Sequence, residues 1–108
     1  MKYFNVNSYG HEYRVRIEAS KYQSNGTLAL SLITDTEEPY CNLTVNIDES
    51  IIWADDKTAF VDTNNCPWAE EFITKNGLGE FYGYNGRSGF CLYPLFKFNM
   101  DKIKEVSE

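Results

Sequence analysis

The feature of this sequence that most constrains its fold is an alternation of apolar and polar residues that returns along the chain. Every second side chain between residues 13 and 19 is apolar or aromatic, and every second position from 28 to 32 is leucine. Successive side chains of a strand point to opposite faces, so this period of two predicts strands that bury one face. The Ser24-Asn25-Gly26 segment between them favours a turn, which predicts an antiparallel hairpin.

The rest of the chain holds further candidate strands and a second hairpin. Four more segments are predicted to form strands: residues 41–47, 58–61, 80–84 and 90–98. The last two are rich in aromatic residues and flank a glycine-containing turn at residues 85–89, so they are predicted to pair. Pro94 lies inside the second of them and indicates an edge strand or a bulge, because proline cannot donate to a sheet ladder.

One main helix is predicted at about residues 66–76. Asn64 or Asn65 is suited to cap its first turn, and Pro67 is tolerated there. Apolar residues recur along it at spacings of four, which places them on one stripe. Gly77 follows and is typical of a helix end.

These elements predict an α+β fold. We expect an antiparallel sheet of five to seven strands, with the helix at about 66–76 packed on one face. A short helix is expected at residues 101–106, capped by Asn99 or Asp101. With 108 residues, 43% of them hydrophobic and 16% aromatic, the chain is predicted to form a single domain over residues 1–108.

Charge and cysteine content limit the partners that we expect. The formal net charge of −6 argues against direct binding to nucleic acids or anionic membranes, because phosphates repel an acidic surface. No apolar run reaches the roughly 20 residues of a membrane-spanning helix, and the first residues lack a signal peptide. Three cysteines without a close pair are typical of free thiols in a reducing compartment, so we expect a cytoplasmic protein.

Residues that carry chemistry are few and dispersed. His11 is the single histidine, which removes most acid–base schemes, and Cys66 has no base near it in sequence. Cysteines 41, 66 and 91 with His11 have the composition of a zinc site but lack its paired spacing. We therefore predict no catalytic residue, no metal and no cofactor. An enzyme that uses Cys66 as nucleophile, activated in the first turn of a helix, stays as an alternative.

Acidic residues gather in two segments that are predicted to be loops, and these form the candidate binding site. The proposed electrostatic face comprises Asp35, Glu37, Glu38, Asp48, Glu49, Asp55 and Asp56. Trp53 lies within the second segment and is suited to act as an apolar anchor. Such a face would attract a basic groove on a protein partner.

Aromatic side chains offer a second candidate surface. The chain has more aromatic residues than one small core needs, and exposed aromatics are frequent binding anchors. The candidates, apart from Trp53, are Tyr82, Tyr84, Tyr93, Phe96 and Phe98. We expect core packing to bury most of them.

The segments VDTNNCPWAEEFITKNGLGE and YNGRSGFCLYPLFKF are the most distinctive stretches of a region, Tyr40 to Phe98, that resembles a family of small uncharacterised proteins. That family is carried on bacterial conjugative transposons, plasmids and other mobile elements. The resemblance implies a non-enzymatic inhibitor, such as an anti-CRISPR or antirestriction factor that blocks the basic nucleic-acid-binding surface of a Cas nuclease or restriction enzyme. The alternative is an accessory protein-interaction module of conjugation or element maintenance, and the oligomeric state stays open.

Overall fold

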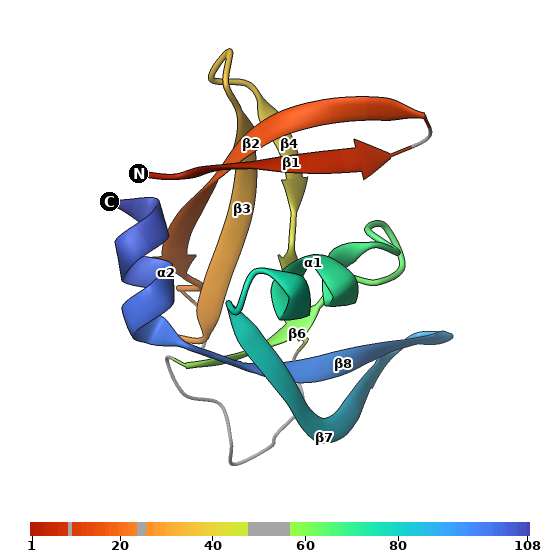
Figure 1. The fold of residues 1–108 in the computed structure, drawn as a ribbon. Helices are drawn as coiled ribbons and strands as arrows, with labels where there is room; N and C mark the ends of the chain where they lie inside the picture. Colours follow the sequence, from red (N-terminus) through yellow and green to blue (C-terminus); the bar gives the residue numbers. More distant parts are fainter. Residues whose placement is uncertain (9, 24–25, 48–56) are drawn as a thin grey trace.

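The computed structural model describes residues 1–8, 10–23, 26–47 and 57–108, and most of them lie in two antiparallel sheets (Figure 1). The first sheet contains, in spatial order, β1 (Tyr3–Ser8), β2 (His11–Lys21), β3 (Leu28–Thr34) and β4 (Pro39–Asn42). The second contains β5 (Thr44–Val45), β6 (Thr58–Val61), β8 (Cys91–Phe98) and β7 (Gly79–Ser88). Two short helices, α1 (Ala69–Lys75) and α2 (Met100–Ser107), complete the described structure.

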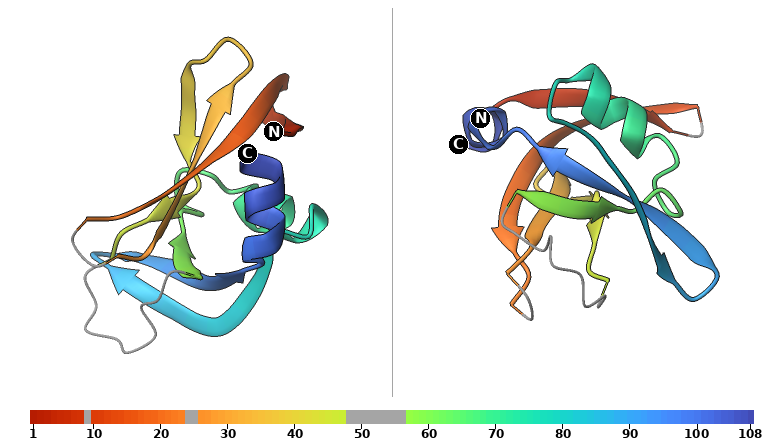
Figure 2. Two further views of the ribbon diagram at one scale, coloured as in Figure 1. Left: turned by 90° about the vertical axis from the view of Figure 1, so that its left-hand side faces the viewer. Right: turned by 90° about the horizontal axis from the view of Figure 1, so that it is seen from below.

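The predicted α+β fold, with one sheet and a main helix on its face, is wrong. The structure is mostly β, and its described residues form eight strands in two sheets instead of five to seven in one. Apolar alternation identifies a strand but does not say which strands pair, so it cannot distinguish one sheet from two. The views in Figure 2 show the two sheets facing each other, with α2 beside the ends of both.

The chain passes from one sheet to the other at Leu43. Residues 41–47 were predicted as one strand, but β4 and β5 belong to different sheets and only Leu43 separates them. Its N–H donates to the Leu30 carbonyl in the first sheet at 2.9 Å, and its carbonyl accepts from the Asp62 N–H beside the second at 2.8 Å. Leu43 is fully buried and has its backbone groups paired on both sides, so it forms a corner that joins the sheets.

The first hairpin is confirmed, and it gains a strand that the prediction omitted. Strands β2 and β3 pair in an antiparallel register that places Ile17 opposite Leu32. Strand β1 then pairs with β2, so that Phe4 lies opposite Val15. The alternation of Phe4 and Val6 with asparagines follows the same period of two, but it is short and was not recognised as a strand.

Helix α1 is shorter than the predicted helix at about 66–76, and it is not capped by Asn64 or Asn65. The Asp62 carboxylate accepts hydrogen bonds from the Asn65 N–H at 3.2 Å and from its side-chain amide at 2.9 Å. The Cys66 N–H donates to the Asp62 carbonyl at 2.9 Å. These bonds build a turn in place of a first helical turn, so the helix begins only at Ala69.

The ends of the helices agree better with the sequence. Gly77 has a positive φ of 67° directly after α1, as expected of a helix end. The Asn99 side chain accepts a hydrogen bond from the Lys102 N–H at 3.2 Å, which confirms Asn99 as the cap of α2. The helix lies beside β2, and Ile103 and Val106 are its buried residues.

The second hairpin is confirmed, but it is longer than predicted and its proline has a different place. Strand β7 continues to Ser88, so the turn lies at residues 89–90 and not at 85–89. Pro94 is in β8, which lies between β6 and β7 and is therefore not an edge strand, although the pairing of β8 with β6 ends at Leu95, one residue before Pro94 is reached. The bulge is confirmed, because the register shifts in β7 between Phe81 and Asn85, the partner of Pro94.

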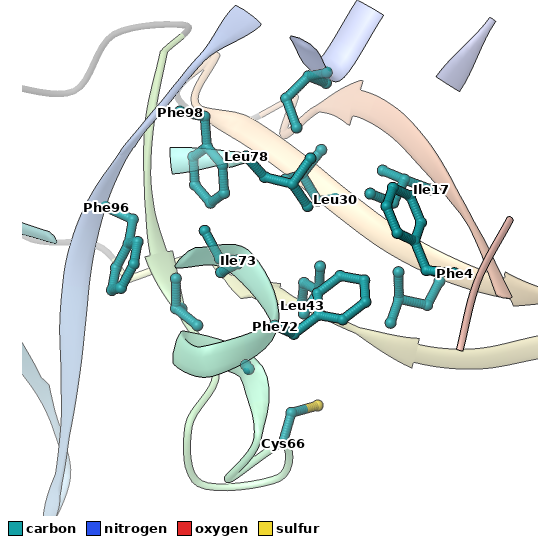
Figure 3. Packing of buried hydrophobic residues seen from close by; sticks show 14 of the residues in the cluster. Phe4, Ile17, Leu30, Leu43, Cys66, Phe72, Ile73, Leu78, Phe96 and Phe98 are labelled. Atoms are coloured by element: carbon teal, nitrogen blue, oxygen red, sulfur yellow. The ribbon is translucent and has the colours of Figure 1, made fainter. Parts of the chain in front are cut away.

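The hydrophobic core lies between the two sheets and receives side chains from both helices (Figure 3). Phe96 and Phe98 of β8 lie on one side of it, with Leu30 of β3 across from them. Ile73 of α1 fills the space between. One continuous core therefore holds the two sheets together.

Candidate functional site

The first acidic segment forms the tight turn between β3 and β4. Asp35, Glu37 and Glu38 are all exposed there, as the electrostatic hypothesis requires. Glu37, however, is engaged within the molecule: its carboxylate accepts from the Arg16 guanidinium at 2.7 Å. That hydrogen bond raises the pKa of Arg16. Among the residues that the structure describes, Asp35 and Glu38 have no ion-pair partner.

The remaining candidates of the acidic face lie outside the described residues. These are Asp48, Glu49, Trp53, Asp55 and Asp56. Their placement relative to the β3–β4 turn therefore stays a prediction. The structure brings together only the carboxylates of the first segment.

The outer end of the β7–β8 hairpin carries the most exposed large hydrophobic side chain of the described residues. Phe90, in the turn, has a relative exposure of 108%, and Leu92 has 54%. Figure 1 shows this end of the hairpin projecting away from the sheets. We call Phe90 and Leu92 the hairpin tip.

The position of Leu92 on β8 explains why it is uncovered. Residues two apart on a strand share a face, so Leu92 lies on the same face of β8 as Phe96 and Phe98. Those two phenylalanines are buried in the core, with 1% and 3% of their surface exposed. Strand β8 therefore extends past the edge of the core, and Leu92 lies on its core-facing side where the core no longer covers it.

The aromatic candidates named from the sequence fall into two groups. Tyr82 is exposed and Tyr84 is half-buried. Tyr93, Phe96 and Phe98 are buried, which confirms the expectation that packing takes most of this set. It also removes Tyr93 as a binding anchor. Phe90 and Leu92 were missed, although a phenylalanine next to a turn glycine was a signal that could have identified the tip.

A hollow of about 250 Å³ lies where the β1–β2 end of the first sheet meets the segment before α1. Its walls include His11, Tyr40, Cys41, Cys66 and Trp68. The fold thus brings both thiols to one place although they are far apart in sequence. We call this hollow the thiol pocket.

Aromatic rings line one side of the thiol pocket. The Tyr13 and Tyr40 ring centroids are 4.7 Å apart, and Tyr40 stacks on Trp68 at 6.1 Å. Burial raises the pKa of Tyr40, whose hydroxyl also hydrogen-bonds Ser8. The pocket therefore has an apolar wall with the sulfur atoms beside it.

The two thiols of the pocket interact directly. Their hydrogen bond raises the pKa of Cys41 and lowers that of Cys66, because the Cys41 thiol donates and a thiolate on Cys66 accepts. When Cys66 is protonated, its thiol donates instead to the Asn42 carbonyl at 3.7 Å. The first proton to leave the pair is therefore the one on Cys66.

The zinc alternative finds no geometric support. Within the described residues, no group of three or more His, Cys, Asp and Glu side chains is placed to hold a metal ion. His11, Cys41, Cys66 and Cys91 are all described, and the three cysteines are unpaired. The shared pocket of His11 with two thiols was not foreseen, because no local spacing in the sequence signals it.

Comparison with known proteins gives a family but no activity. Neither described helix is long and apolar enough to cross a membrane. No curated protein and no solved structure matches the chain. A family model described as a domain of unknown function, DUF4313, matches residues 16–108, which confirms the expectation of an uncharacterised family. Since that match covers most of its length, the chain belongs to the DUF4313 family.

Proposed function

We propose that this domain acts by binding another protein, without catalysing a reaction, and that the hairpin tip enters its partner. The observation that carries the proposal is the full exposure of Phe90 together with the half exposure of Leu92, two residues further along the chain. Fully burying one such side chain contributes about 2 kcal/mol. In the free protein, the fully exposed Phe90 gains none of this free energy and the half-exposed Leu92 gains only part of it. A partner recovers that free energy, and aromatic residues, phenylalanine included, are enriched at the cores of protein interfaces.

The chemistry of the partner follows from charge as well as shape. The tip needs an apolar pocket to receive it. The chain as a whole carries a net charge of −6, which favours a partner protein with a basic surface. Free thiols and the lack of a membrane-spanning helix in the described residues fit the proposal that the domain works in the cytoplasm.

A photo-crosslinking experiment tests the docking point. A benzophenone amino acid is placed at Phe90, and the matched control places it at Thr74, which is exposed on α1. We expect a crosslinked protein band from position 90. An excess of untagged wild-type protein should suppress this band, whereas untagged protein with Phe90 substituted should not. Equal crosslinking from Thr74, or full suppression by a competitor carrying Phe90→Ser and Leu92→Ser, would exclude the tip.

The second candidate function is inhibition of a basic nucleic-acid-binding surface, as in an anti-CRISPR or antirestriction factor. Exposed Asp35 and Glu38 favour it, together with the net charge. In Figure 1 their turn lies at the opposite end of the molecule from the hairpin tip, so the two surfaces are separable by mutation. Asp35→Lys with Glu38→Lys should abolish inhibition of a Cas nuclease or restriction enzyme in a plasmid-interference assay, whereas Phe90→Ser should leave it intact.

An origin on a mobile genetic element also belongs to this proposal. It rests on the resemblance of the two distinctive segments alone. Genes for conjugation, integration or partition beside those of the family would support it. A constant chromosomal neighbourhood of housekeeping genes would contradict it.

A further inference from the structure

We propose that Cys41 and Cys66 form a reversible disulfide when the domain meets a hydroperoxide. The thiol pocket is then a redox-modification site, independent of the protein-binding function proposed above. Both residues line the pocket, and they come from different parts of the chain: Cys41 from β4 and Cys66 from the segment between β6 and α1.

The contacts around Cys66 bring its sulfur close to β4. The Cys66 Sγ lies 3.7 Å from the carbonyl oxygen of Asn42, the residue that follows Cys41. Cys41 is half-buried and faces the same pocket. A disulfide requires a sulfur–sulfur distance of about 2.05 Å, with α-carbons about 4.4–6.8 Å apart. The proposed bond requires both side chains to rotate about their Cα–Cβ bonds until the sulfur atoms meet at that distance.

The thiol pocket gives a small oxidant access to this cysteine pair, which a fully enclosed pair of cysteines would not have. Cys66 is 1% exposed and lies at the edge of the core cluster in Figure 3. The pocket beside it opens toward His11, which is exposed. A small oxidant can therefore reach the sulfur atoms through the pocket, whereas a protein thiol cannot.

The reaction balances without any further reagent. The Cys66 thiolate attacks one oxygen of the peroxide, so that a sulfenic acid forms and the O–O bond breaks. The Cys41 sulfur then attacks the sulfenic sulfur, and the S–S bond forms as water leaves. With hydrogen peroxide, two thiols are oxidised by two electrons and the peroxide is reduced to two molecules of water.

The bond would link the two sheets near their corner. It would join β4 of the first sheet to the segment that follows β6 of the second. Tyr40 and Trp68, the neighbours of the two cysteines, already stack across the same boundary. Oxidation would therefore fix the arrangement of the thiol pocket and stabilise the fold.

Thiol counting after treatment with hydrogen peroxide tests the proposal. Free thiols in the denatured protein should fall from three to one, and dithiothreitol should restore all three. The matched control is Cys91→Ser, which should fall from two to none. Cys66→Ser should retain both remaining thiols under the same treatment, whereas Cys41→Ser should form no disulfide and lose at most the Cys66 thiol, as a sulfenic acid. Peptide mapping of the wild type should show one 41–66 crosslink.

A thermal measurement gives a second readout on the unsubstituted chain. Closing a loop of this length is expected to raise Tm by roughly 10 °C. In a Trp53→Phe background, oxidation should also quench the fluorescence of Trp68. Loss of thiols that dithiothreitol does not reverse, a crosslink through Cys91, or equal loss in Cys41→Ser would each overturn the proposal.

Discussion

Both ends of strand β8 carry large apolar side chains, but those at its inner end, next to α2, are buried and those at its outer end, next to the turn, are exposed. Phe96 and Phe98, at the inner end, are buried against both helices and the first sheet. Phe90 and Leu92, at and beside the turn, are exposed. An apolar residue contributes to the stability of the free protein only where the opposite sheet covers it. The comparison therefore separates residues that hold the fold from residues available to a partner.

The largest effect is expected at the inner end. Phe96→Ala should lower the free energy of unfolding by about 3–5 kcal/mol, because it removes a fully buried ring and leaves a cavity. Urea denaturation followed by circular dichroism would measure it. A loss below about 1 kcal/mol would show that the inner end is not part of the core and would break the comparison.

A smaller effect is expected where β7 begins. A Cβ added at Gly79 would lie 2.7 Å from the Lys97 carbonyl oxygen, a backbone atom of the paired strand. Gly79→Ala should therefore cost about 1–3 kcal/mol in unfolding free energy, because β8 must shift. Ser88→Ala, in an exposed position of the same strand, is the control and should change stability little. Similar values for both would mean that the inner end of the hairpin is no more tightly packed than the outer.

The cap of α2 should contribute less. Asn99→Ala removes the acceptor for the Lys102 N–H and should cost about 1 kcal/mol. Asn99→Asp keeps an acceptor at the same place and should retain most of the stability. Thermal unfolding of the three proteins sharpens the comparison, because Ile103 and Val106 reach the core from this helix. Equal losses for both variants would argue that side-chain packing, and not capping, fixes α2.

The smallest effect on stability is expected at the outer end. Phe90→Ala should change the free energy of unfolding by no more than about 0.5 kcal/mol, because the ring has no covering neighbours to lose. As an untagged competitor, the Phe90→Ala protein should fail to suppress crosslinking from the benzophenone protein. A destabilisation comparable to that of Phe96→Ala would show that the tip is packed, and the docking proposal would fall with it.

Sequence reasoning identified the strands well because their signal is local. The β2–β3 hairpin and β6 were expected from alternation over a few residues, and their pairing confirms it. The helix predicted at about 66–76 is present as α1, but its start was placed too early, for a reason that is also local. The Asp62 carboxylate satisfies backbone donors that a first helical turn would otherwise use. Hydrogen bonding by a single side chain outweighed helix propensity.

The candidate sites depend on contacts between distant parts of the chain, which a single sequence does not reveal. Arg16 pairs with Glu37, and this removes one carboxylate from the acidic face that composition suggested. Cys41 and Cys66 meet only because the corner at Leu43 brings the sheets together. Predicting that Phe90 is exposed would have required knowing where along β8 the hydrophobic core ends. The sequence shows which residues could bind or react, but it does not show which other residues surround them in the fold.

The corner at Leu43 also bears on how the protein unfolds. The next residue, Thr44, accepts a hydrogen bond from the Leu30 N–H at 3.0 Å, and its hydroxyl contacts that of Tyr22 at 3.1 Å. One buried segment is thus shared by both sheets, and neither sheet can open while the other keeps all of its bonds. Two sheets joined in this way are expected to melt in a single cooperative transition, with amide hydrogens of both exchanging at similar rates.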